Sequence, residues 1–94
     1  MTVRWTRQAL RDLDQLRDYT FRYSRRGAEK LVAKIDRSLQ LLASHPEMGR
    51  LGRIEGTREL IVPRTPYIVV YQLAADQIRL LAIIHSARRW PTEL

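Results

Sequence analysis

The sequence predicts an α+β fold made of one domain over residues 1–94. A short N-terminal strand and an antiparallel helical hairpin come first, followed by a three-stranded antiparallel meander packed on the helices. Two observations support this prediction. Apolar residues recur at helical spacing over residues 9–42, and from residue 57 onward they follow the two-residue period of strands. A chain of 94 residues can bury one modest core, which excludes a second domain.

The N-terminal part is predicted to form a strand followed by a helix. Residues 2–5 alternate, with Val3 and Trp5 on one side, which is typical of a short strand. One helical face then contains Ala9, Leu13, Leu16, Thr20 and Tyr23. We expect this face to be buried together with Leu10, because the opposite side of the helix carries charged residues.

A second helical period follows Gly27 and ends before Pro46, which cannot continue a helix. Its apolar stripe consists of Ala28, Leu31, Val32, Ile35, Leu39 and Leu42. We expect the two helices to fold back on each other, because only the residues from Ser24 to Gly27 join them. The segment from Pro46 to Gly56 holds three of the four glycines and is predicted to be a loop.

The last third of the chain is predicted to form the meander. A first strand contains Leu60 and Val62, and a turn bracketed by prolines at residues 63–66 leads to a second strand, Tyr67–Leu73. The third strand runs over Ile78–His85. Both faces of the last two strands are apolar, so we expect them to lie centrally and to be covered on at least part of both sides.

The charge of the chain indicates an anionic partner. The net charge is +7, from 17 basic and 10 acidic residues, and fifteen of the basic residues are arginine. Guanidinium groups pair well with phosphates and carboxylates, so we expect a polyanion or an acidic protein as the partner. The absence of cysteine excludes disulfides and cysteine metal sites. It also fits a cytoplasmic protein, and no signal-peptide core or membrane-spanning run is present.

The ionisable residues predict no cofactor and no metal site. Asp14 and Asp18 lie one helical turn apart, but Arg17 and Arg22 are close enough to form ordinary helical ion pairs with them. The two histidines lie forty residues apart and do not suggest a zinc site. His45 is expected to contact the carbonyl groups at the end of the second helix.

Seven residues in the last third of the chain are not needed for folding, and we expect them to carry the function. This polar set consists of Arg58, Arg64, Tyr67, His85, Arg88, Arg89 and Trp90. His85 ends a strand and is either a proton-transfer group or a half-buried residue bonded to backbone. Metal-free RNA cleavage needs a base, an acid and a cation, and arginine supplies only the cation. The remaining acid-base candidates, Glu59, Tyr67 and His85, make a thin set, and Tyr71 is expected in the core.

Two patterns in this region extend the interpretation. The segment from Gly56 to Tyr71 has the pattern G-x-R-E-L-x-x-P-R-x-P-Y-x-x-x-Y, and the segment from His85 to Pro91 has the pattern H-x-x-R-x-W-P. With the predicted elements and an L-x-x-x-P-x-x-G segment ending at Gly49, the chain resembles the RelE/ParE superfamily of type II toxins along nearly its whole length. The resemblance implies that fold and a growth-inhibiting toxin. It also implies an antitoxin that is encoded by an adjacent gene and neutralises the toxin in a hetero-oligomer.

The superfamily divides by target, and the resemblance favours its ParE-like branch. RelE-like members cut mRNA on the ribosome, whereas ParE-like members poison DNA gyrase. In the RNA-cleaving branch a catalytic arginine precedes a Val-Tyr pair, and matching Val70 and Tyr71 to that pair places Ile68 at the arginine position. Trp90 lacks the hydroxyl of the terminal tyrosine that some members use as a base. We therefore expect a gyrase poison without chemistry of its own, which contacts its target through the polar set.

Two alternatives stay open. A RelE-like endoribonuclease would act without metal on ribosome-bound mRNA, with His85, Arg64 and Arg88 as its catalytic residues. A nucleic-acid-binding module without toxicity would use its arginines to follow phosphates. The sequence also leaves open whether Trp5 and Trp90 belong to the core or to an interface.

Overall fold

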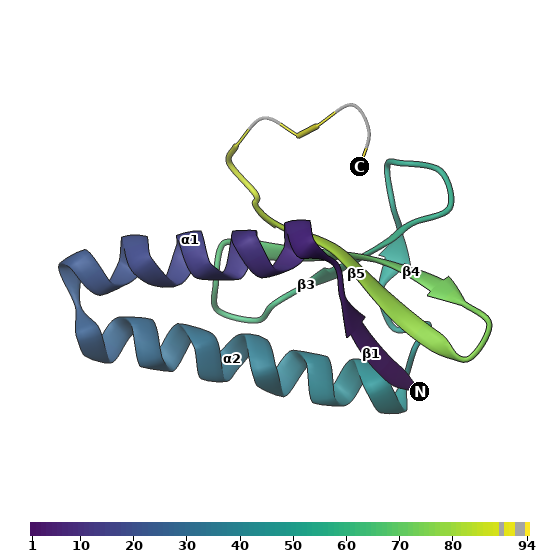
Figure 1. Cartoon of the computed structure of the whole chain (residues 1–94), viewed down its shortest axis with the longest axis horizontal. Helices are drawn as coiled ribbons and strands as arrows, with labels where there is room; N and C mark the ends of the chain where they lie inside the picture. The colour runs from purple at the N-terminus through teal and green to yellow at the C-terminus, as the bar shows by residue number, and fades with distance from the viewer. Residues whose placement is uncertain (89, 92–93) are drawn as a thin grey trace.

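The computed structural model describes residues 1–88, 90, 91 and 94, and it shows a helical hairpin packed against a five-stranded sheet (Figure 1). The elements in chain order are β1 (Thr2–Trp5), α1 (Arg7–Tyr23), α2 (Arg25–Ser44), β2 (Arg50–Leu51), β3 (Arg58–Ile61), β4 (Tyr67–Ala74) and β5 (Gln77–His85). The strand order is β1-β5-β4-β3-β2, with β1 parallel to β5 and the other neighbours antiparallel. The α+β class, the hairpin and the β3–β4–β5 meander are confirmed.

The connection between the helices is one residue, Ser24, and the predicted loop from Ser24 to Gly27 is wrong. Ser24 caps both helices. Its backbone N–H donates to the Thr20 carbonyl at 2.9 Å, and its hydroxyl accepts from the Gly27 N–H at 2.8 Å. Because serine is a strong helix N-cap, α2 begins before the glycine, which lies in its first turn.

Two strands extend the sheet beyond the meander. β1 lies beside β5, with Thr2 opposite Gln77 and Trp5 opposite Leu80. β2 pairs with β3 inside the segment that the sequence predicted as a loop. Both residues of β2 are exposed, so this strand carries no alternating pattern that could have revealed it. Among the described residues, neither α1 nor α2 combines the length and apolarity needed to cross a membrane.

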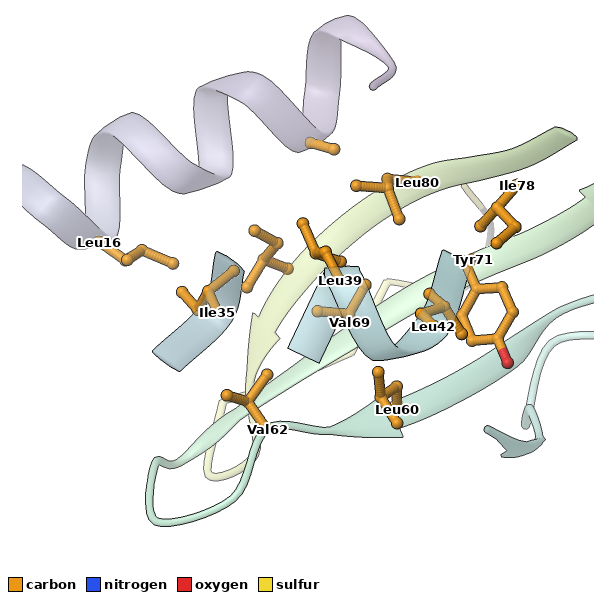
Figure 2. Close-up of a cluster of buried hydrophobic side chains, with 12 residues drawn as sticks. Leu16, Ile35, Leu39, Leu42, Leu60, Val62, Val69, Tyr71, Ile78 and Leu80 are labelled. Carbon is orange, nitrogen blue, oxygen red and sulfur yellow. The ribbon is translucent and has the colours of Figure 1, made fainter. Parts of the chain in front are cut away.

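The core lies between the hairpin and one face of the sheet (Figure 2). Trp5 packs against this cluster and so belongs to the core side of the molecule. The predicted burial of Leu10 and Tyr23 is wrong, because these side chains are 47% and 76% exposed. Tyr23 is the last residue of α1, and the helical hairpin extends past the sheet in Figure 1. The labelled core side chains are Leu16, Ile35, Leu39, Leu42, Leu60, Val62, Val69, Tyr71, Ile78 and Leu80.

The other face of the sheet is also buried in its middle. Ile68, Val70 and Ala82 are at most 5% exposed, although they alternate with residues that point into the core. This confirms the expectation that β4 and β5 are covered on at least part of both sides. Arg53 and Trp90, from outside the meander, stack on each other. Arg53 also bonds to Glu59 of β3, which lies opposite Val70.

Candidate functional site

The turn between β3 and β4 positions Arg64. The Val62 N–H donates to the Tyr67 carbonyl at 3.0 Å, and the Thr65 hydroxyl donates to the Val62 carbonyl at 2.9 Å. The same hydroxyl accepts from the Tyr67 N–H at 3.1 Å. These bonds hold Arg64 at a φ of 58°, in the left-handed region that glycine occupies without steric cost. The Arg64 side chain is therefore presented to solvent from a strained backbone position.

The paired ends of β4 and β5 position Tyr67 and His85. The two residues are opposite each other, and their rings meet edge to face with centroids 5.4 Å apart. The Ala87 N–H donates to Nδ1 of His85 at 3.1 Å. In a neutral ring Nε2 then carries the hydrogen and acts as a donor. The Arg88 N–H donates to the His85 carbonyl at 3.0 Å, which turns the chain after β5.

These side chains line one pocket of about 480 Å³ between the helical hairpin and the β3–β4 turn. We call it the basic pocket. Among the described residues its charged lining is entirely positive, with Lys30 and Lys34 from α2, Arg64 from the turn and Arg88 from the segment after β5. The rest of the lining is Tyr19, Thr20, Gly27, Leu31, Thr65, Pro66, Tyr67, His85 and Ala87.

The four cations of the basic pocket form no ion pair with any other described residue. Lys34 reaches the Arg64 carbonyl through its Nζ, at 3.5 Å, which connects α2 to the turn. A concave surface lined by charges of one sign concentrates the electrostatic potential inside it. The basic pocket is therefore suited to an anionic group.

Lys30 and Lys34 were not predicted as site residues, and they lie outside the apolar stripe that predicted the second helix. One signal was available. They are the only lysines of the chain and lie four residues apart, which places them on the same side of a helix.

Two of the seven predicted residues, Arg58 and Trp90, do not line the basic pocket. Arg58 donates from Nη1 to the carbonyls of Gly49, at 2.9 Å, and Glu47, at 3.2 Å, and so fastens the segment after α2. Trp90 stacks on Arg53, whose guanidinium carbon is 3.5 Å from the ring centroid. Arg89 lies outside the described residues. The remaining four, Arg64, Tyr67, His85 and Arg88, line the pocket together.

Glu59, considered above for proton transfer, is a buried anchor. The residue is only 3% exposed. One carboxylate oxygen accepts from Arg50 at 2.9 and 3.1 Å, and the other accepts from the Arg53 backbone N–H at 2.8 Å and its Nε at 3.3 Å. Burial acts to raise the pKa of Glu59, but these donors outweigh burial and hold that pKa below its usual range.

Tyr71 belongs to the core, as predicted, and its hydroxyl is fully engaged. It accepts from the Gly49 N–H at 2.9 Å and donates to the Pro46 carbonyl at 2.8 Å. Burial raises the pKa of Tyr71, against the opposing effect of the Gly49 hydrogen bond. Ile68, at the position that the resemblance assigns to a catalytic arginine, is 5% exposed.

A second and larger hollow of about 940 Å³ runs along α1 and the outer part of β5, and we call it the edge groove. β1 covers β5 only as far as Leu80, so the outer edge of β5 beyond that residue does not pair with β1. Asp12 accepts from the Ile83 N–H at this edge, at 2.9 Å. The groove contains Asp12 and Asp18 as well as basic and apolar residues, so its charge is mixed. In the described part of the chain, no three His, Asp or Glu side chains are grouped as a metal ion requires.

Comparisons with known proteins agree with this fold. The profile of the family described as "ParE toxin of type II toxin-antitoxin system, parDE" matches residues 3–90. "Putative toxin Y4kP" of Sinorhizobium fredii is 38% identical over 92 residues, which cover 98% of this chain and 95% of that protein. "Toxin RelE2" of Caulobacter vibrioides is 34% identical over 86 residues, covering 92% and 96%. The solved structure "Chromosomal ParDE TA system from P. aeruginosa" superposes with a TM-score of 0.79 at 28% identity, covering 90% of this chain and 95% of that one.

Proposed function

The chain belongs to the ParE toxin family of type II toxin-antitoxin systems, and we propose that it arrests growth by binding DNA gyrase and trapping it on cleaved DNA. This action would take place in the cytoplasm, in one domain over residues 1–94. The basic pocket supplies the contact surface. Arg64, Tyr67, His85 and Arg88 are the proposed contact residues, and arginine and tyrosine commonly dominate binding energy at interfaces.

The observation that carries this proposal is the lack of a matched acid and base among the described side chains of the site. Nδ1 of His85 is occupied by a backbone N–H, and Glu59 is bound by two arginines. Arginine stays protonated and serves poorly as a base. RNA cleavage requires a proton acceptor and a proton donor in reach of the reacting atoms. The pocket therefore supports binding better than cleavage.

The other predicted residues have supporting roles in this proposal. Arg58 and Trp90 hold the segments that flank the sheet, and Arg89 remains a predicted contact residue. Lys30 and Lys34 join the contact set because they line the same pocket.

A cognate antitoxin encoded by an adjacent gene is the second proposed partner, and it neutralises the toxin within a hetero-oligomer. The edge groove supports this part of the proposal. Its lining includes Leu81 and Ile83, and the outer edge of β5 next to them is not paired with β1. An extended antitoxin segment could add to this edge by replacing Asp12 at the Ile83 N–H. An acidic antitoxin segment would also meet the positive net charge of +7.

The test measures both targets with the purified chain. We expect gyrase-DNA cleavage complexes to accumulate, and mRNA on programmed ribosomes to stay intact. The double variant Arg64→Ala with Arg88→Ala should stabilise at least about tenfold fewer complexes, as expected when two interface anchors are lost. A matched control, Arg4→Ala with Arg37→Ala, removes the same charge outside the pocket and should retain the effect. Cleaved mRNA without any gyrase complexes would overturn the proposal.

The similarity to "Toxin RelE2" favours one second candidate, a ribosome-dependent endoribonuclease that uses His85, Arg64 and Arg88. His85→Gln separates the two candidates. An acid-base role predicts a loss of at least about a hundredfold in mRNA cleavage. A contact role predicts a smaller loss, measured as the yield of gyrase-DNA cleavage complexes, because glutamine keeps a side-chain donor near the same place.

A further inference from the structure

The basic pocket retains an arginine where the backbone favours a different residue. Arg64 has a φ of 58°, and its side chain forms no hydrogen bond or ion pair with the described residues. Glycine would adopt this conformation without a steric penalty. Strained positions of this kind are typical of sites where a side chain serves a ligand and contributes little to the fold.

The positive groups around the pocket come from separate elements. Lys30 and Lys34 approach from the helical hairpin, Arg64 from the β3–β4 turn and Arg88 from the segment after β5. A single planar carboxylate is bound well by one arginine fork, whereas a phosphate accepts hydrogen bonds on several sides. Cations that come from three separate elements therefore match phosphate better than they match an isolated carboxylate.

The remaining lining fits a nucleic-acid strand. Tyr19 is 50% exposed and lines the pocket together with Tyr67, so two aromatic side chains stand beside the cations. Bases stack on such rings without a strict sequence preference. The volume of about 480 Å³ exceeds the space that a lone phosphate fills and falls in the range of ligand pockets.

We propose that the basic pocket binds the phosphate backbone of DNA. The inference rests on the proposed function and deepens it: the toxin contacts the DNA that gyrase holds, in addition to the enzyme. Lys30 and Lys34 lie one helical turn apart, so they can meet successive phosphates of one strand. His85 adds a further donor through Nε2, because its Nδ1 accepts from the Ala87 N–H.

The first experiment measures binding of the full chain to a fluorescently labelled DNA duplex by anisotropy, over a series of salt concentrations. The pocket variant is Lys34→Gln with Arg88→Gln, and the control is Arg4→Gln with Arg37→Gln, which removes the same charge outside the pocket. We expect the pocket variant to bind about tenfold more weakly or worse. Its plot of log affinity against log salt should lose about two units of slope, since each phosphate contact contributes about 0.9. The control should stay within about threefold of the parent chain.

The second experiment uses the strained backbone of Arg64. Arg64→Gly relieves the strain and should keep or raise the melting temperature, yet it should weaken DNA binding at least about threefold by removing one phosphate contact. Ala75, at a φ of 45°, provides the matched control. Ala75→Gly relieves comparable strain in the β4–β5 turn and should leave DNA affinity unchanged.

Three outcomes would overturn the inference. In the first, the pocket variant binds DNA within about twofold of the parent chain, and in the second, the charge-matched control loses as much DNA affinity as the pocket variant. In the third, the pocket variant loses binding to a polyglutamate peptide while its binding to DNA stays intact. Gyrase cleavage complexes are measured in parallel with the parent chain. If they accumulate while the pocket variant binds DNA normally, the inference fails and the proposed function stands. If DNA binding depends on the pocket but gyrase is unaffected, the proposed function fails and the inference stands.

Discussion

The guanidinium carbon of Arg53 lies 3.5 Å from the centroid of the Trp90 ring, while the backbone N–H and Nε of Arg53 bond to the buried Glu59 carboxylate. A cation over an indole face is attracted by the ring electrons. Glu59 sits in β3 and Trp90 belongs to the C-terminal segment, so Arg53 joins that segment to the sheet. The same segment carries Arg88 into the basic pocket.

Glu59→Gln should destabilise the fold at neutral pH by about 2 kcal/mol, because the change removes the charge that four nearby donors from Arg50 and Arg53 share. The pKa of Glu59 is lowered by folding, so its contribution is present above the ordinary pKa of glutamate and is lost as the pH falls through the folded value. Urea unfolding of both chains should therefore show a difference in stability that shrinks below about pH 4. The exposed pair Arg25–Glu29 supplies the control, and Glu29→Gln should cost less than about 0.5 kcal/mol. A difference that stays constant with pH would contradict this role of the carboxylate.

Arg53→Ala should release Trp90 from its stacked position. The measurement is tryptophan fluorescence in a Trp5→Phe background, where Trp90 is the remaining indole. We expect emission shifted to the red and stronger quenching by acrylamide, because the ring loses the guanidinium that covers it. Arg79→Ala is the control, since that exposed guanidinium bonds to Gln72 and should leave the emission unchanged. Unchanged emission in the Arg53 variant would show that other contacts hold the indole.

Tyr71→Phe should cost about 2 kcal/mol in the free energy of unfolding. The change leaves the Gly49 N–H and the Pro46 carbonyl without their partner in a buried place. Denaturant unfolding measures the loss, and Tyr19→Phe, at a half-exposed residue, should change stability by less than about 0.5 kcal/mol. Gly49→Ala tests the same contact from the other side, because an added Cβ would lie 2.6 Å from the Tyr71 hydroxyl. Wild-type stability of both variants would be incompatible with this contact.

Ser24→Ala should destabilise the helical hairpin by about 1 kcal/mol, since the hydroxyl that caps α2 is lost. The effect is measurable by thermal unfolding followed by circular dichroism. Ser44→Ala, at the exposed last residue of α2, is the matched control and should have little effect. If the two variants melted together, the cap would have no part in stability.

Apolar spacing was sufficient to predict the helices, the meander and most of the core, because burial on one face imposes a regular period on the sequence. Ile35, Leu39 and Leu42 follow that period and are buried. Contacts that depend on single polar atoms left no such period. The cap at Ser24 is one example, in which a single hydroxyl accepts from a backbone N–H. The Glu59–Arg53 contact is another, in which a single carboxylate accepts from a backbone N–H.

The candidate site was predicted in part, for a related reason. Arg64 and Arg88 were identified because neither fits an apolar pattern, and both line the basic pocket. Arg58 met the same criterion but fastens a loop, since the sequence does not show which carbonyls surround a guanidinium. Lys30 was missed because its neighbours in space come from distant parts of the chain.

The parallel pairing of β1 with β5 has a consequence for the order of folding. Thr2 lies opposite Gln77, and two helices and three strands lie between β1 and β5 in the sequence. Pairings between residues so far apart in sequence form late and slowly. The edge of β5 that β1 covers therefore stays open while the helical hairpin and the meander form, and the addition of β1 to the sheet is the expected last step of folding.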